Sequence, residues 1–230
     1  MQKSVKIALG AVVVVILLGG AGFYWFFLRD DAPKRASLQT SGQANQSSSD
    51  DPASADGTWK VQQADGVFVG YRVQELFGGD TIKVTAVGRT PGVDGTLTVA
   101  GTEITAADIT ADMTLLKSDK APRDGQIKTR GIETNNFPKA EFKLTQPITL
   151  PGSPEKGKEV DVTATGELTL HGVTKTVEIP LKAVWNGGTI TVAGGAKLAF
   201  SDFDIEPPTN ALVSVDDNGE FELQLTFVPA

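Results

Sequence analysis

His171 is the only histidine in the chain, and it lies within TGELTLHGVTKTVEIP, residues 165–180. A histidine acts as a general base only when a nucleophile or a substrate proton lies within hydrogen-bond reach. The sequence offers no such partner, because it contains neither a G-x-S-x-G motif nor a cysteine. A single histidine without cysteine also excludes disulfides, thiolate zinc sites and multi-histidine metal sites. We therefore expect no catalytic residue, no metal ion and no cofactor.

The pattern around His171 predicts a turn instead. Apolar residues alternate with polar ones up to Leu170, and they alternate again from Val177 onward in the opposite phase. A hairpin connection requires such a change of phase, and Gly172 is free to adopt a positive φ. We interpret His171 as a turn residue.

Two charged stretches are candidates for binding. The acidic stretch SVDDNGEFEL, residues 214–223, does not have the spacing of a calcium loop, and its Asn218-Gly219 pair predicts a hairpin turn. Arg123 and Arg130 lie in the one segment that breaks the strand pattern. They are candidate contacts for an anionic ligand head group, although Arg123 beside Asp124 also suits an ion pair that fixes a loop.

The N-terminal segment reads as a membrane anchor. Residues 7–28 form a run of 22 without a charge that ends in the aromatic cluster of residues 23–27. Such a run is long enough to cross a hydrocarbon core of about 30 Å, and aromatic residues favour the membrane–water interface. We predict a transmembrane signal anchor in residues 1–36 with the C-terminal domain outside the cytoplasm. The alternative is a signal peptide cleaved near residues 20–22.

The rest of the chain divides into a linker and one domain. Residues 37–56 are rich in Ser, Gln, Asp and Ala, which predicts a flexible linker. From residue 57 to residue 230 the apolar residues recur with a period of two, as in Phe221, Leu223, Leu225 and Phe227. About eight to ten antiparallel strands, with a short helix or loop near residues 121–138, predict a barrel or a sandwich. The net charge of −7 argues against a nucleic-acid partner.

The large apolar residues of these strands are the main functional candidates. A barrel of eight strands either fills its interior with side chains or leaves room for one slender ligand, and periodicity does not separate these cases. The candidates for the apolar lining are Phe68, Tyr71, Phe77, Met113, Leu115, Ile127, Phe137, Phe142, Leu168, Trp185, Phe200 and Phe221.

Several motifs together resemble one family. These are GELTLHGVT at residues 166–174, the Arg123-Asp124 pair followed by Phe137-Pro138, and FVGYRVQE at residues 68–75. They are similar to the YceI-like family of lipid- or polyisoprenoid-binding domains, in particular to its membrane-anchored actinobacterial type. The resemblance implies a lipocalin-like antiparallel barrel with an apolar interior, and it places the short helix of the family between Arg123 and Phe137.

The resemblance also has a gap and leaves two functional readings. Many family members carry histidines around their first long strand, where this chain has Asp65-Gly66 and Gln74-Glu75, so polar contacts made by those histidines do not carry over. The first reading is a membrane-tethered carrier of a polyisoprenoid or fatty-acid-like lipid. The alternative is a non-catalytic envelope scaffold with a filled barrel core. A lipid-acting enzyme would need His171 to face a cavity, which its turn position disfavours.

Overall fold

The computed structural model describes residues 22, 24, 25, 29, 31–38, 52–79, 81–209 and 212–230. Most of the predicted anchor and of the predicted linker therefore lies outside the described residues. Within the described part of the chain, no helix has the length and the apolar character needed to cross a membrane.

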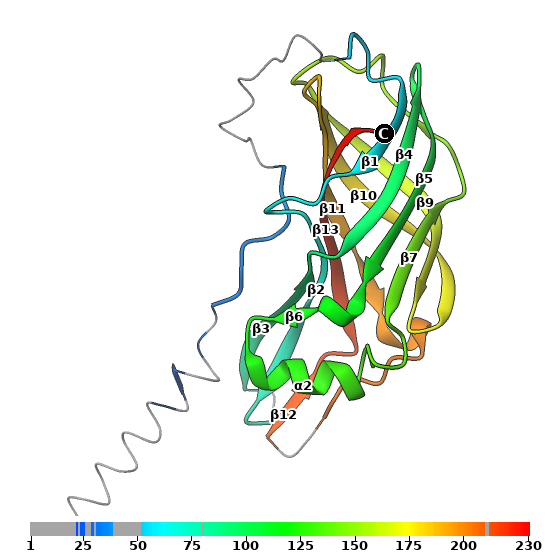
Figure 1. Ribbon diagram of the computed structural model, residues 1–230. Coiled ribbons are helices and arrows are strands. Elements are labelled where there is room, and N and C mark those ends of the chain that lie inside the picture. Colours follow the sequence, from blue (N-terminus) through cyan, green and yellow to red (C-terminus); the bar gives the residue numbers. More distant parts are fainter. Residues whose placement is uncertain are drawn as a thin grey trace, which may run out of the picture.

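Eight antiparallel strands close into a barrel (Figure 1). The ring closes because the last strand pairs with the first, Phe227 lying opposite Val61. The prediction of an antiparallel barrel is confirmed, and the alternative of a sandwich is excluded. In order around the ring the strands are β1 (Gly57–Val61), β4 (Val93–Ala100), β5 (Glu103–Asp112), β7 (Lys139–Leu144), β9 (Glu159–Leu170), β10 (Val173–Trp185), β11 (Ile190–Ala199) and β13 (Asn218–Pro229).

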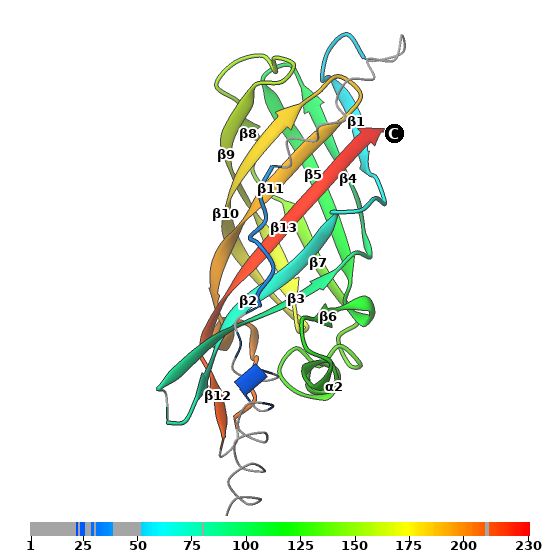
Figure 2. The ribbon, with the colours of Figure 1, turned by 90° about the vertical axis from the view of Figure 1, so that its left-hand side faces the viewer.

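Strand β13 has two partners on the same edge. Its C-terminal part pairs with β1, whereas its N-terminal part pairs with β2 (Phe68–Phe77). Strand β2 continues the sheet into β3 (Ile82–Thr90) and β6 (Lys117–Ser118). The helix α2 (Ala121–Thr129) lies beside the strands β2, β3 and β6, at one end of the barrel (Figures 1 and 2). We call it the α2 end.

Two short strands complete the sheet. Strand β8 (Ile148–Thr149) pairs with β5, and β12 (Val213–Val215) pairs with the end of β2. The hairpin predicted at Asn218-Gly219 is wrong, because β12 and β13 do not pair with each other but follow one another along β2. The backbone amide of Asp216 donates to the carbonyl oxygen of Gln74 at 3.0 Å. Strand β2 extends beyond the end of β13, and β12 pairs with this extension. Residues 216–217 therefore connect two consecutive strands that both pair with β2.

The predicted short helix is confirmed as α2. Pro122 lies in its first turn, where the missing amide proton costs no hydrogen bond. Asp124 in the first turn and Lys128 in the last turn both complement the helix dipole. The helix buries only Ile127, which attaches it to the barrel interior.

The turn predicted at His171 is also confirmed. Leu170 pairs with Val173, so His171 and Gly172 form a two-residue hairpin loop with φ of 52° and 75°. The Nδ1 atom of His171 lies 3.1 Å from the carbonyl oxygen of Phe203, and its ring packs on Phe137 at a centroid distance of 4.1 Å. These contacts hold the hairpin against the neighbouring loop.

Two glycine-to-alanine changes should have opposite effects on stability. Gly172 has a positive φ, and an added Cβ would lie 2.8 Å from Cε1 of Phe137, so Gly172→Ala should lower the free energy of unfolding by about 1–2 kcal/mol. At Gly125 in α2 a Cβ would meet nothing within 4 Å, so Gly125→Ala should raise it by about 0.5–1 kcal/mol. Urea unfolding of both variants measures the difference, and equal midpoints would contradict the turn geometry.

Candidate functional site

The barrel interior contains two adjoining chambers. The chamber at the α2 end has a volume of about 130 Å³, and the far chamber has about 90 Å³. An engineered apolar cavity of about 150 Å³ binds benzene, so each chamber has room for a slender apolar group. Four residues line both chambers and therefore mark their junction: Val69, Ala140, Leu168 and Phe221. A cavity arranged end to end in this way suits a chain better than a wide ring system.

Three aromatic side chains of the chamber walls occupy the space that a Cβ would need at a glycine. A Cβ added at Gly88 would lie 2.3 Å from Cε1 of Tyr71, and one added at Gly166 would lie 2.5 Å from Cζ of Phe142. The ring of Phe200 covers Gly219 in the same manner, at 2.8 Å. All three rings line the chambers.

Sequence reasoning missed these glycines. A glycine inside a strand pattern signals close approach of another group, and an aromatic ring often covers it from the neighbouring strand. The glycines were therefore the available signal, but which ring covers each one depends on strand pairing.

A charged network closes one side of the α2-end chamber. Arg123 donates from Nε and Nη2 to the two carboxylate oxygens of Glu75 at 2.7 and 2.6 Å, and from Nη1 to Asp119 at 2.5 Å. Burial alone would lower the pKa of Arg123, but its hydrogen bonds and its attraction to Glu75 and Asp119 outweigh burial and raise that pKa. Two carboxylates thus compensate this guanidinium.

Tyr71 lies next to the same network. Burial raises the pKa of its hydroxyl well above the usual range, while the positive charge of Arg123 acts in the opposite direction. The hydroxyl therefore remains protonated at any physiological pH. Tyr71 contributes a neutral surface to the chamber.

The α2-end chamber reaches exposed residues on the helix. Gln126 and Arg130 line it and are both exposed, whereas Ile127 between them is buried. The chamber therefore has its mouth beside α2. Of the two predicted head-group contacts, Arg130 lies at this mouth and Arg123 lies in the compensated network.

Seven of the predicted apolar residues come together in the lining of the chambers. They are Tyr71, Met113, Ile127, Phe142, Leu168, Phe200 and Phe221. The other five lie outside the lining of both chambers: Phe68, Phe77, Leu115, Phe137 and Trp185.

Each of these five residues lies outside the lining for a local structural reason. Phe68 and Tyr71 are three positions apart on one strand, so they face opposite sides of the sheet, and Phe68 lies outside, 3.9 Å below the guanidinium of Arg89. Leu115 belongs to a 3₁₀ turn (Met113–Leu115) that leaves the barrel wall, and its side chain is exposed.

The remaining three residues lie at strand ends and turns. Phe77 is the last residue of β2, beyond the ring of eight strands, where it pairs with Ile82. Phe137 covers the His171 hairpin. Trp185 ends β10, and its Nε1 donates to the carbonyl oxygen of Gly187 at 2.7 Å.

The described residues hold no group of three or more His, Cys, Asp or Glu side chains arranged to bind a metal ion. What the arrangement provides is a tube with apolar walls and a few polar groups at one mouth. Such a tube is suited to apolar groups, whose transfer out of water is favourable.

Comparison with known proteins adds the family. Residues 59–227 match the YceI-like domain. A UPF0312 protein of Vibrio parahaemolyticus is 35% identical over 106 residues, which is 43% of this chain and 52% of that protein. Protein YceI of Escherichia coli O157:H7 is 28% identical over 148 residues, which is 60% of this chain and 71% of that protein. The chain thus spans about half the length of the Vibrio relative.

Two solved structures share the fold. A polyisoprenoid binding domain from Saccharophagus degradans, implicated in plant cell wall breakdown, has a TM-score of 0.58 at 16% identity, covering 75% of this chain and 98% of that one. Burkholderia cenocepacia BcnA has a TM-score of 0.52 at 19% identity, with coverage of 72% and 98%. The family match extends over most of the chain, from the first barrel strand to the last, and the protein therefore belongs to the YceI-like domain family.

Proposed function

We propose that the protein is a non-catalytic carrier that holds a polyisoprenoid or a similar long-chain amphiphile in its barrel. The observation that carries this proposal is the pair of adjoining chambers with almost entirely apolar walls. Each CH₂ group removed from water contributes roughly 0.8 kcal/mol. A chain that threads both chambers therefore binds tightly without a specific polar contact.

We assign the ligand head to the α2 end because polar residues lie at that mouth. Arg130 and Gln126 line the mouth and are exposed, so they are available to a head group that remains in water. Arg123 is compensated by Glu75 and Asp119, which makes it a poor partner for an anion. The ligand head therefore contacts Arg130 first.

The ligand class is supported by a relative. The Saccharophagus degradans domain with the same fold is described as polyisoprenoid binding. At 16% identity that likeness shows the fold alone, so the ligand class of this chain is part of the proposal. The apolar lining and the slender shape of the two chambers agree with it.

The proposed place of action is the outer side of a membrane. The predicted anchor in residues 1–36 would tether the barrel as a single-pass protein, in the manner of the membrane-anchored YceI-like type. The uncharged run of residues 7–28 supports this assignment.

Blocking the junction of the chambers should empty the barrel. Ala140 lines both chambers, so the indole in Ala140→Trp would fill the passage. Ala106 lies on the same sheet but is exposed, so Ala106→Trp is the matched control. Solvent extraction and mass spectrometry of the purified full chain should find one prenyl or acyl species per protein in the wild type and in Ala106→Trp, and less than a tenth of it in Ala140→Trp.

The same extraction decides between carrier and scaffold. A folded wild-type chain that yields no lipid would contradict the carrier and favour the filled-core interaction module. A circular dichroism spectrum of Ala140→Trp that matches the wild type shows that the loss is local.

Gly88→Ala should weaken binding through Tyr71. The three atoms nearest to the added Cβ all belong to the Tyr71 side chain, so the ring must swing into the α2-end chamber. Loss of room for two CH₂ groups costs about 1.6 kcal/mol, which lowers affinity about fifteenfold. Titration with a fluorescent long-chain fatty acid measures the change.

A second substitution tests this mechanism. Tyr71→Ala in the Gly88→Ala background removes the displaced ring and should restore binding. Gly125→Ala adds a methyl group in open space and should leave affinity unchanged. An unaltered affinity of Gly88→Ala would refute the assigned role of the glycine.

A further inference from the structure

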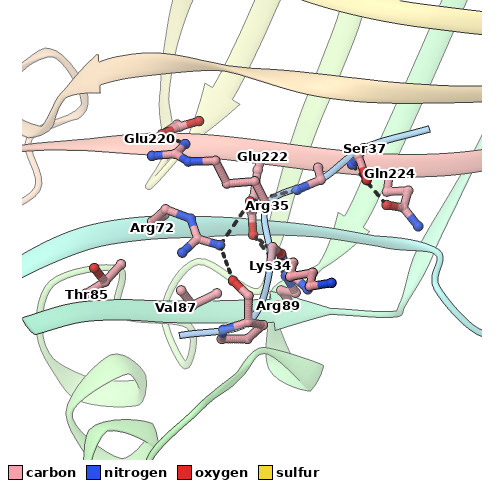
Figure 3. Close-up of polar contacts among 12 residues, drawn as sticks. Lys34, Arg35, Ser37, Arg72, Thr85, Val87, Arg89, Glu220, Glu222 and Gln224 are labelled. Atoms are coloured by element: carbon pink, nitrogen blue, oxygen red, sulfur yellow. Dashed lines mark hydrogen bonds and ion pairs between the residues drawn. The ribbon is translucent and has the colours of Figure 1, made fainter. Parts of the chain in front are cut away.

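Residues 33–37 lie along the outer face of β2 and β13 (Figure 3). We call them the strap. Arg35 pairs with Glu220, the amide of Ala36 donates to Glu222 at 3.3 Å, and the amide of Ser37 donates to the side-chain oxygen of Gln224 at 3.3 Å. The three partners are alternate residues of β13, so the strap runs alongside that strand, away from the α2 end.

The surface under the strap contains a row of three residues across three strands. Arg89 of β3 lies opposite Gly70 of β2, which lies opposite Glu222 of β13. A Cβ at Gly70 would lie 2.9 Å from Cγ of Arg89. Because glycine has no side chain, Arg89 crosses β2 and donates to Glu222 from Nε at 2.9 Å and from Nη2 at 2.7 Å.

The strap supplies further hydrogen-bond acceptors to the arginines of this surface. Glu222 is 2% exposed and Arg72 beside it is 8% exposed, although both project from the outside of a barrel. Two guanidinium groups share this one carboxylate, and the Nη2 atom of each also donates to the strap backbone. Arg72 donates to the carbonyl oxygen of Pro33 at 2.6 Å, and Arg89 donates to that of Lys34 at 2.5 Å. Charged groups buried outside a core need such partners, so this surface is a built docking site.

Arg29, which precedes the strap, contacts the α2 end. Lys120, at the beginning of α2, donates from Nζ to the carbonyl oxygen of Arg29 at 3.3 Å. Arg29 follows directly on the uncharged run of residues 7–28. The four residue-to-residue steps from Arg29 to Pro33 span at most about 14 Å. The exposed apolar side chains of Ile82 and Leu212 also lie at this end, beside β12.

We propose that the docked strap holds the α2 end, with the mouth of the cavity, toward the bilayer. The inference rests on the proposed membrane anchor and ligand site. An undocked tether of residues 29–56 would have a mean span of about 30 Å and would let the barrel rotate freely. With the strap docked, the distance in sequence between the proposed anchor and the barrel surface shortens to the piece before Pro33. Lipid then passes between bilayer and cavity while the barrel remains in one orientation.

The orientation is measured by energy transfer on the full chain in phosphatidylcholine–phosphatidylglycerol nanodiscs. The sequence has no cysteine, so Lys128→Cys on α2 and Ser153→Cys at the other end of the barrel each give one labelling site. Both positions are exposed, and the 12 residues of β9, tilted as barrel strands are, separate the two ends by about 30 Å along the barrel axis. The acceptor is a dye on the lipid head groups.

The wild-type strap should give strong transfer from position 128 and weak transfer from position 153. Arg35→Ala combined with Ala36→Pro removes the ion pair with Glu220 and the hydrogen bond from the amide of residue 36 to Glu222, and it changes no residue of the barrel. This double variant should make the two signals converge. Lys34→Ala removes the same charge as Arg35→Ala but keeps the carbonyl oxygen that Arg89 uses, so it should behave as wild type.

Three outcomes would overturn the proposal: equal transfer from both positions in the wild type, no transfer from either, or no effect of the strap double variant. Solvent extraction of the same preparations separates this proposal from the carrier function. Bound lipid with equal transfer would refute the orientation alone, whereas an empty barrel with unequal transfer would refute the carrier alone.

Discussion

The division of β13 between two partners is the constraint on which the rest of this structure depends. The strand has 12 residues, and β1 covers only its last part. The earlier part pairs with β2 instead, which brings β3 and β6 into the wall and sets α2 beside the interior. The mouth of the cavity and the outer face that contacts the strap both depend on this change of pairing partner from β1 to β2.

The sequence predicted what local pattern determines and failed where distant segments meet. Alternation of apolar residues predicts either a closed antiparallel barrel or a sandwich. The change of phase after Leu170 predicts the hairpin at His171. The large apolar side chain of Phe68 suggests an interior position. The period of two along the strand, however, places Phe68 and Tyr71 on opposite faces of the sheet. The Asn218-Gly219 turn failed because the free edge of β2 is invisible in the local sequence. The compensation of Arg123 by Glu75 likewise joins residues 48 positions apart.

Glycine has the same physical role on both sides of the wall. Inside, Gly88 and Gly166 leave room for the rings of Tyr71 and Phe142, which line the chambers. Outside, Gly70 lets Arg89 reach Glu222 across an intervening strand. Strand glycine normally weakens a sheet because it has no side chain to pack. Here a ring or a guanidinium from the neighbouring strand occupies the place of each missing side chain. The surface of the sheet therefore stays covered at each glycine.

The end-to-end arrangement of the two chambers has a kinetic consequence. A flexible chain held in single file leaves only by sliding along its own length past the junction at Leu168 and Phe221. Each CH₂ group drawn out re-exposes apolar surface, so the barrier to release grows with the number of groups inside. Residence time, rather than recognition of the head group, then distinguishes long chains from short ones. Under the proposed carrier function, a barrel of this form would retain long hydrocarbon chains for longer than short ones.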